Sequence, residues 1–91
     1  MSCSTKVTII NDRGLHARAS AKFVTFVSRL PQEINVEVAK DGQSVSGTSI
    51  MGLMMLGAAK GDDITITVTG ENSEKICQKL EGLVLDGFGE D

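Results

Sequence analysis

The sequence predicts an α+β fold, an open-faced β-sandwich in which three helices cover one face of a four-stranded antiparallel sheet. Three observations lead to this prediction. The periodic segments follow one another in the order strand, helix, strand, strand, helix, strand, helix. Apolar and polar residues alternate strictly in the second and fourth strands, which leaves one sheet face in water and favours antiparallel pairing. The 91 residues are enough for one domain, spanning residues 1–91, with one thin core.

The first strand is predicted over residues 6–11, where β-branched residues alternate with polar ones, and the turn-forming residues 11–14 end it. A helix is predicted from Ala17, because the apolar residues change to the period of a helix. Pro31 ends this helix, since a residue before proline disfavours the α conformation. One face of the helix carries Ala19, Phe23, Phe26, Val27 and Leu30.

The second strand is predicted over residues 34–39, and residues 43–47 form the return strand. Asp41 and Gly42 connect them as a two-residue hairpin turn, in which both central residues need a positive φ. A short helix follows over residues 49–56, which are apolar on nearly all sides. Ser49 provides a capping hydroxyl at its start, and Gly57 ends it.

The fourth strand, residues 64–69, alternates Ile and Val with Thr and is the clearest one-sided strand of the chain. The last helix is predicted to begin near Asn72 or Ser73 and to end before Gly87. Its apolar side carries Ile76, Cys77, Leu80, Leu83 and Val84.

Composition excludes several classes of function. The net charge is −3, and the chain has three Phe and no Tyr or Trp, so it lacks the basic and aromatic surface that nucleic-acid binding needs. The longest uncharged apolar run, residues 47–59, is too short to span a membrane, and no signal segment opens the chain. We therefore expect a cytoplasmic monomer. Cys3, in a terminus expected to be frayed, and Cys77 are expected to be free thiols.

The only histidine, His16, directly precedes the helix predicted from Ala17. Backbone N–H groups in the first turn of a helix lack helical partners and lie at the positive end of the helix dipole, so they form an anion site. A phosphoryl group on the imidazole would meet the N–H groups of Ala17 and Arg18 and the Arg18 guanidinium, with Arg13 and Lys22 nearby in sequence. Position alone also permits an exposed histidine without a role. A metal site is not expected, because no Asp, Glu or Cys stands at ligand spacing.

Two segments resemble the signatures of a known family. Gly-Leu-His-Ala-Arg at residues 14–18 resembles the active-site signature of HPr, the histidine phosphocarrier of the bacterial phosphoenolpyruvate-dependent phosphotransferase system. Ser-Ile-Met-Gly-Leu-Met at residues 49–54, with Leu-Gly and Ala-Lys-Gly following, is similar to the second HPr signature. The resemblance extends from about residue 6 to the C-terminus, and the predicted order of elements is that of the HPr fold.

The resemblance implies a phosphoryl carrier rather than an enzyme. Nδ1 of His16 would accept a phosphoryl group from phosphorylated Enzyme I and pass it to an EIIA protein, while Arg18 stabilises the phosphate. No cofactor is implied, because the magnesium requirement belongs to Enzyme I. A ferredoxin-like, metabolite-binding domain is the structural alternative, but the element order lacks the symmetry of that fold.

Ser49 has two compatible interpretations. A serine at this place is a good N-cap whatever else is true. The resemblance also implies regulatory phosphorylation of Ser49 by the bifunctional HPr kinase/phosphorylase. A phosphate is electrostatically favourable at a helix start, and its charge would repel acidic or phosphorylated partners.

The helix predicted over residues 49–56 also indicates a docking surface. At least half of its large apolar residues are expected to join the core. The others, which we expect to be Ile50, Met51 and Met54, would form an exposed apolar patch beside His16, and such patches mark protein contacts. Flexible methionines suit several partners, which the resemblance identifies as Enzyme I, an EIIA protein and the serine kinase.

Ala19 departs from the family pattern, because HPr usually has proline directly after the arginine. Alanine keeps the helix propensity and the N–H group, so we expect the chemistry to survive and the substitution to act on the positioning of the preceding loop and the match to partners. Ala19, the run at residues 19–23 and the Gly-Phe-Gly-Glu-Asp tail resemble the nitrogen-related branch of these carriers. The alternative function is therefore a regulatory binding module whose phosphorylation state controls partner proteins rather than sugar uptake.

Overall fold

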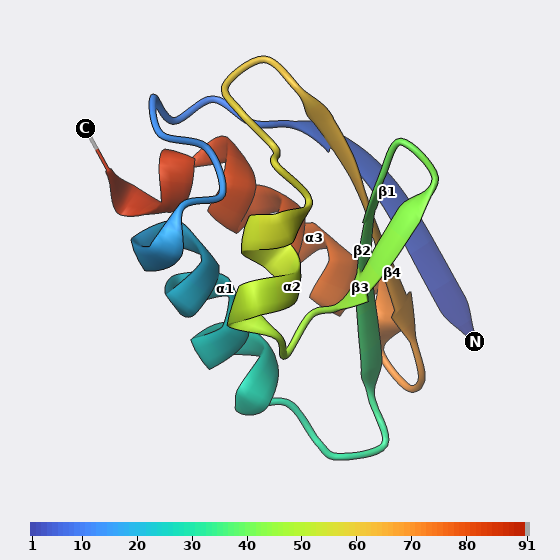
Figure 1. Ribbon diagram of the computed structural model, residues 1–91. Coiled ribbons are helices and arrows are strands. Elements are labelled where there is room, and N and C mark those ends of the chain that lie inside the picture. Colours follow the sequence, from blue (N-terminus) through green and yellow to red (C-terminus); the bar gives the residue numbers. More distant parts are fainter. Residues whose placement is uncertain (91) are drawn as a thin grey trace.

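The computed structural model describes residues 1–90 and has the predicted α+β architecture (Figure 1). Its strands are β1 (Ser2–Thr8), β2 (Asn35–Lys40), β3 (Gln43–Ser46) and β4 (Asp63–Thr69). Its helices are α1 (Ala17–Ser28), α2 (Ile50–Met55) and α3 (Ser73–Leu85), and a 3-10 turn, η1 (Gly87–Gly89), follows α3. The predicted order of strands and helices is confirmed. None of the helices in residues 1–90 has the length and apolar character needed to cross a membrane.

The four strands form one antiparallel sheet in the order β1-β4-β2-β3. On β4, Ile64, Ile66 and Val68 are buried, whereas the alternating Thr65 and Thr67 are only partly buried. The three helices lie on the same side of the sheet (Figure 1). The apolar side chains therefore face the helices, which confirms the one-sided sheet that the alternation predicted.

The hairpin between β2 and β3 turns at the predicted residues. Asp41 and Gly42 have φ angles of 51° and 84°, and the adjacent Lys40 and Gln43 form the last residue pair of the two strands. Positive φ at both turn residues matches the twist of the hairpin to that of the sheet. This turn lies at the edge of the sheet and leaves the helix-covered face unaffected.

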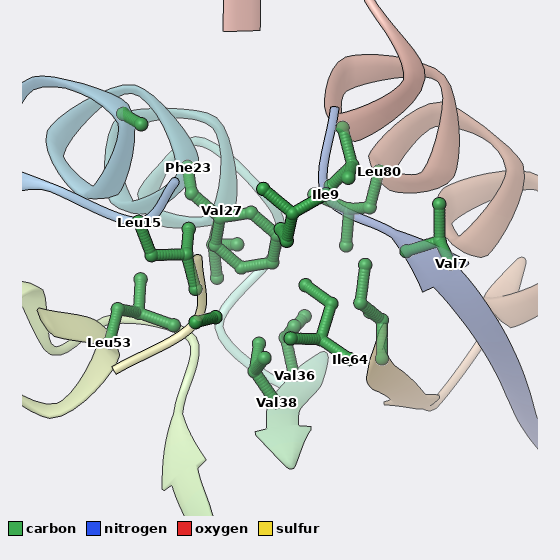
Figure 2. Packing of buried hydrophobic residues seen from close by; sticks show 14 of the residues in the cluster. Val7, Ile9, Leu15, Phe23, Val27, Val36, Val38, Leu53, Ile64 and Leu80 are labelled. Carbon is green, nitrogen blue, oxygen red and sulfur yellow. The ribbon is translucent and has the colours of Figure 1, made fainter. Parts of the chain in front are cut away.

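The core lies between the sheet and the helices (Figure 2). Phe23 of α1, Ile66 of β4 and Leu80 of α3 are completely buried. Burying a side chain of this size stabilises the fold by about 1.5–3 kcal/mol. Ile9 and Leu15 also belong to the core, at 1% and 4% exposure, so the loop that precedes α1 is anchored at both of its ends.

Several predicted boundaries are wrong. β1 covers residues 2–8 rather than 6–11, and the expected frayed terminus is a strand, because residues 2–5 pair with residues 66–69 of β4. Cys3 accordingly lies opposite Val68. At the end of α1, the N–H groups of Arg29 and Leu30 bond to carbonyls three residues earlier, so the chain tightens into a turn before Pro31.

Candidate functional site

His16 is the N-cap of α1, at the position that the sequence indicated. Its backbone is extended, with φ −76° and ψ −176°, and its carbonyl accepts the first helical hydrogen bond, from the Ser20 N–H at 2.9 Å. The ring Nδ1 accepts a hydrogen bond from the Arg18 N–H at 3.3 Å. Ala17 and Arg18, the two residues predicted to bind phosphate through their backbone, form the exposed start of the helix. The imidazole therefore lies at the positive end of the helix dipole.

Gly14 fixes the path of the loop that leads to His16. Its φ is +61°, and a β-carbon at this position would lie 2.2 Å from the Ala58 carbonyl oxygen. Only glycine permits both features without strain. The next residue, Leu15, is buried in the core, and its N–H donates to the same Ala58 carbonyl at 2.9 Å. In the Gly-Leu-His sequence, Gly14 packs its backbone against Ala58, and Leu15 is buried in the core. Together they fix the position of the partly exposed His16 ring.

The second ring nitrogen of His16 contacts an acidic side chain from the end of the chain. Nε2 lies 2.6 Å from Glu90 Oε2, and the His16 and Glu90 side chains are 23% and 15% exposed. Asn11, itself buried, holds the other carboxylate oxygen, because its Nδ2 donates to Glu90 Oε1 at 3.1 Å and to the Gly14 carbonyl at 2.8 Å. Both partners of this amide are acceptors, so its orientation is determined.

The charge state of Glu90 follows from these contacts. Burial opposes the ionisation of its carboxyl group. Hydrogen bonds from Asn11 and His16 and the positive charge of Arg18 outweigh that cost, and they hold the pKa of Glu90 below its usual range. Glu90 is therefore a carboxylate at neutral pH, and a carboxylate only accepts hydrogen bonds.

The contacts of the His16 ring determine which nitrogen can react. Nε2 carries a proton, because its partner is the Glu90 carboxylate. In a neutral imidazole the lone pair then resides on Nδ1, as the hydrogen bond from the Arg18 N–H requires. At 3.3 Å this bond is long, so an electrophile can replace it. Nδ1 is thus a nucleophile that points to the start of α1.

An open hollow of about 460 Å³ lies next to Glu90 and gathers the basic residues that surround His16 in the sequence. Within residues 1–90, no ion pair engages the guanidinium group of Arg13 or Arg18, whereas Asp12 pairs with Lys60 at 3.1 Å. Two such arginines beside a helix N-terminus attract an anion with several oxygen acceptors. The hollow is lined by Asp12, Arg13, Arg18, Lys22, Gly89 and Glu90.

Ser49 is the N-cap of α2, as predicted, and its Oγ accepts a hydrogen bond from the Gly52 N–H at 2.9 Å. α2 lies beside α1 and runs in the opposite direction (Figure 1). The contact of Leu15 with Ala58, which follows α2, agrees with this arrangement. Ser49 therefore lies at the end of α2 that is remote from His16, and the six residues of the helix span about 9 Å.

The exposed apolar surface of α2 is larger than predicted. Ile50, Met51 and Met54 are exposed, as expected. Met55 is exposed as well, at 75%. The expectation that at least half of the large apolar residues join the core is wrong, because only Leu53 and Leu56 are buried. Met55 follows Leu53 by two positions, which places it on the opposite side of the helix. We call the exposed set the methionine surface: Ile50, Met51, Met54 and Met55.

Both cysteines are free thiols, as predicted. Cys77 is buried on α3, and its Sγ donates to the Cys3 carbonyl at 3.0 Å. Burial, together with the neighbouring Cys3 thiol, raises the pKa of Cys77 to about 11, so this thiol is not ionised at neutral pH. Residues 1–90 contain no group of three or more His, Cys, Asp or Glu side chains that could hold a metal ion.

Asn11 and Glu90 are the site residues that sequence reasoning missed. Asn11 belongs to a turn-forming cluster, and nothing in its neighbours indicates a contact with the end of the chain. Glu90 stands in a short tail in which Phe88 lies between two glycines. That isolated apolar residue is the only sequence signal that the tail is anchored rather than free.

Comparison with known proteins finds that the chain is similar to HPr and HPr-like proteins. The family model described as the PTS HPr component phosphorylation site matches residues 3–86. The phosphocarrier protein HPr of Neisseria meningitidis serogroup A is 45% identical over 84 residues, which cover 92% of each chain. The HPr-like protein Crh of Bacillus subtilis is 37% identical over 79 residues, which cover 87% of this chain and 91% of Crh. The crystal structure of HPr-C-His from Thermoanaerobacter tengcongensis has a TM-score of 0.89 at 34% identity and covers 98% of both chains.

Proposed function

Because this chain belongs to the HPr family of phosphocarriers of the phosphotransferase system, we propose that it carries the phosphoryl group on His16. In this proposal it accepts the group from phosphorylated Enzyme I and passes it to an EIIA protein in the cytoplasm. It acts as a monomeric single domain, needs no cofactor, and is a covalent intermediate of the relay rather than an enzyme. The observation that carries the proposal is the position of His16 at the N-cap of α1, with the Nδ1 lone pair directed at the first turn.

The phosphoryl transfer needs no release of a proton from Nδ1, because this atom carries a lone pair and no proton. The Nδ1 lone pair attacks the phosphorus atom of the donor phosphohistidine, a new N–P bond forms, and the donor N–P bond breaks with its electron pair returning to the donor nitrogen. Nε2 keeps its proton, so the phosphorylated ring carries a positive charge beside the Glu90 carboxylate. In the transfer to EIIA, the ring of His16 becomes the leaving group and is again neutral.

The start of α1 supports the bound phosphate. The N–H groups of Ala17 and Arg18 precede the first helical hydrogen bond, which runs from Ser20 to His16, so both are available to phosphate oxygens. When Nδ1 is phosphorylated, the Arg18 N–H exchanges its ring acceptor for a phosphate oxygen. The Arg18 guanidinium adds charge-assisted hydrogen bonds at the edge of the same site.

The methionine surface is the proposed docking site for Enzyme I, EIIA and the serine kinase. Its four side chains are 40–75% exposed and uninterrupted by charge. An apolar set of this kind on a small protein marks a protein contact. Methionine side chains also repack easily, which suits a surface that meets several partners in turn.

Phosphorylation of Ser49 by an HPr kinase/phosphorylase is proposed as the regulation of this exchange. A phosphate on Ser49 would lie at the start of α2, next to the methionine surface and remote from the His16 ring. It would therefore act on partner docking through charge rather than by contact with the phosphohistidine. Ser49→Asp, which places a negative charge at this position, is the variant that imitates the effect.

A labelling experiment tests the proposal. Incubation with isotopically labelled phosphoenolpyruvate, magnesium and Enzyme I should give a phosphoprotein whose label is stable in alkali and lost in acid. His16→Ala should take up no label, and Ser49→Ala should take up as much as the wild type. Retention of the label in His16→Ala would refute the assignment of His16.

A second candidate function is that of a regulatory module of the nitrogen-related branch, whose phosphorylation state controls partners rather than sugar uptake. The observation that favours it is the tail at residues 87–90, one of the features that resemble that branch, which is docked onto the site. Similarity to Crh, which is described as the catabolite repression HPr of Bacillus subtilis, fits a regulatory role. Transfer rates to a nitrogen-type EIIA and to a sugar-specific EIIA distinguish the two, and faster transfer to the sugar-specific protein would refute this candidate.

A further inference from the structure

Residues 87–90 follow the stretch that the family model matches, and they return to the loop that precedes α1 (Figure 1). Phe88 is 1% exposed and belongs to the hydrophobic core. Lys22 of α1 donates from Nζ to the Phe88 carbonyl at 2.6 Å, and Asn11 donates to the Glu90 carboxylate at 3.1 Å. Three separate contacts therefore hold this short tail against the site.

The backbone of the tail has a conformation that needs such contacts. Gly87, Phe88 and Gly89 have φ angles of 63°, 57° and 72°. A bulky residue such as Phe rarely adopts a positive φ, and it persists there only where its surroundings determine the conformation. The burial of the Phe88 ring and the hydrogen bond from Lys22 provide this constraint. Glu90, two residues further on, is thereby placed with its carboxylate at Nε2 of His16.

We propose that Glu90 is a positioning residue for phosphoryl transfer at His16. Its carboxylate keeps the proton on Nε2 and so leaves the lone pair on Nδ1. It also stabilises the positive charge that the ring gains when Nδ1 is phosphorylated. This inference rests on the proposed function of His16, because it assigns Glu90 a part in the same reaction.

The geometry favours positioning over blocking. Glu90 contacts the ring at Nε2, whereas Nδ1 points to the Arg18 N–H at the start of α1. The two ring nitrogens point in different directions, so the Glu90 carboxylate holds the ring through Nε2 and not through the reacting Nδ1. Carboxylate partners of this kind orient functional histidines and raise their basicity, and their removal typically costs about tenfold to a hundredfold in activity at metal sites.

The first test reads the ring directly and needs no partner protein. In the nitrogen-15 NMR spectrum of the unphosphorylated wild type, we expect a slowly exchanging, downfield proton on Nε2 and an unprotonated Nδ1. In Glu90→Gln, which keeps the shape of the side chain, this proton should move upfield and exchange faster with water. Glu33→Gln removes an exposed carboxylate and is the matched control, which should retain the wild-type signal. An unchanged Nε2 proton in Glu90→Gln would overturn the proposal.

The second test measures the rate of phosphorylation by Enzyme I. We expect Glu90→Gln to be slower by about tenfold and Glu33→Gln to match the wild type. Glu90→Ala should be phosphorylated at least as slowly as Glu90→Gln, and its backbone amide spectrum should show that the variant is folded. A wild-type rate in Glu90→Gln would overturn the role of Glu90 while leaving the proposed function intact. Failure of the wild type to accept the group would instead refute the proposed function.

Discussion

Two helices of this protein begin with a capping side chain that is also a candidate phosphorylation site, and their surroundings differ. At the start of α1, His16 contacts the Glu90 carboxylate, and Arg18 lies in the first turn. At the start of α2, Ser49 caps a six-residue helix whose exposed side chains are the methionine surface. Neither first turn contains an acidic residue, so both helix starts favour an anion.

The difference shows that a capped helix start is not by itself a reactive site. The His16 end combines a nucleophilic ring nitrogen, a partly buried carboxylate on the other ring nitrogen, and arginines at the edge of the site. The Ser49 end offers a hydroxyl that is already engaged with the Gly52 N–H and an apolar surface beside it. We therefore assign the chemistry to the first end and docking, with its regulation, to the second.

Gly14→Ala should disrupt the loop that leads to His16 and should have the largest effect on stability. The new β-carbon would clash with the Ala58 carbonyl at a positive φ, and we expect a loss of about 3 kcal/mol in the free energy of unfolding. Gly82→Ala is the control, because this exposed helical glycine has no atom within 4 Å of the added carbon. There we expect a gain of about 0.5–1 kcal/mol. Urea unfolding measures both changes, and equal effects would contradict this account of the loop.

Arg18→Ala should weaken the chemistry of the same end without a comparable loss of stability. Removing the guanidinium from an exposed phosphate site should slow phosphorylation by Enzyme I about thirtyfold, which corresponds to about 2 kcal/mol in the barrier. Arg29→Ala removes the same charge at the other end of α1. Because salt screens an exposed charge at that distance from the site, we expect the rate to change by less than about twofold. Equal slowing in the two variants would show that general charge, rather than the position of Arg18, is responsible.

Ser49→Ala tests the other helix start. Loss of the hydrogen bond to the Gly52 N–H should destabilise the protein by about 1 kcal/mol, while the rate of phosphorylation at His16 stays at the wild-type value. Ser49→Asp keeps an oxygen cap and should retain the stability but weaken binding to Enzyme I, because it places a charge beside the methionine surface. Calorimetric titration with Enzyme I separates the two variants. Equal affinity of both would remove the proposed regulatory role.

The pH dependence of the tail should give the smallest effect. The pKa of Glu90 is lowered in the folded protein, so its contacts stabilise the fold above the ordinary carboxyl range near pH 4.3 and are lost only as pH falls through the lower folded value. The carbon-13 signal of the Glu90 side-chain carboxyl should therefore keep the chemical shift of a carboxylate between about pH 7 and pH 5. A change of that signal to the chemical shift of a protonated carboxyl within this interval would contradict the ionised Glu90.

The sheet and the longer helices were predictable because their residues repeat with a clear period. β4 alternates apolar residues with threonine, and the turn at Asp41 and Gly42 has the residue types that positive φ requires. The N-cap positions of His16 and Ser49 also followed from local sequence. These features depend on neighbours within a few residues, which sequence reasoning captures.

Features that depend on distant partners were not predictable in the same way. Residues 2–5 have no apolar alternation and become a strand because they pair with β4. In α2 every large side chain is apolar, so no polar residue indicated that Met55 faces outward. The contact of Glu90 with His16 joins residues that are 74 positions apart and depends on the anchoring of Phe88. Such contacts are set by tertiary packing.

The central claim is that Glu90 holds Nε2 and that Nδ1 of His16 is the atom that accepts the phosphoryl group. Phosphorus-31 and nitrogen-15 NMR of the phosphorylated, nitrogen-15-labelled protein tests it most directly, because coupling between the nuclei identifies the bonded nitrogen. We predict coupling of phosphorus to Nδ1, with Nε2 still carrying its proton. Coupling to Nε2 instead would contradict the account.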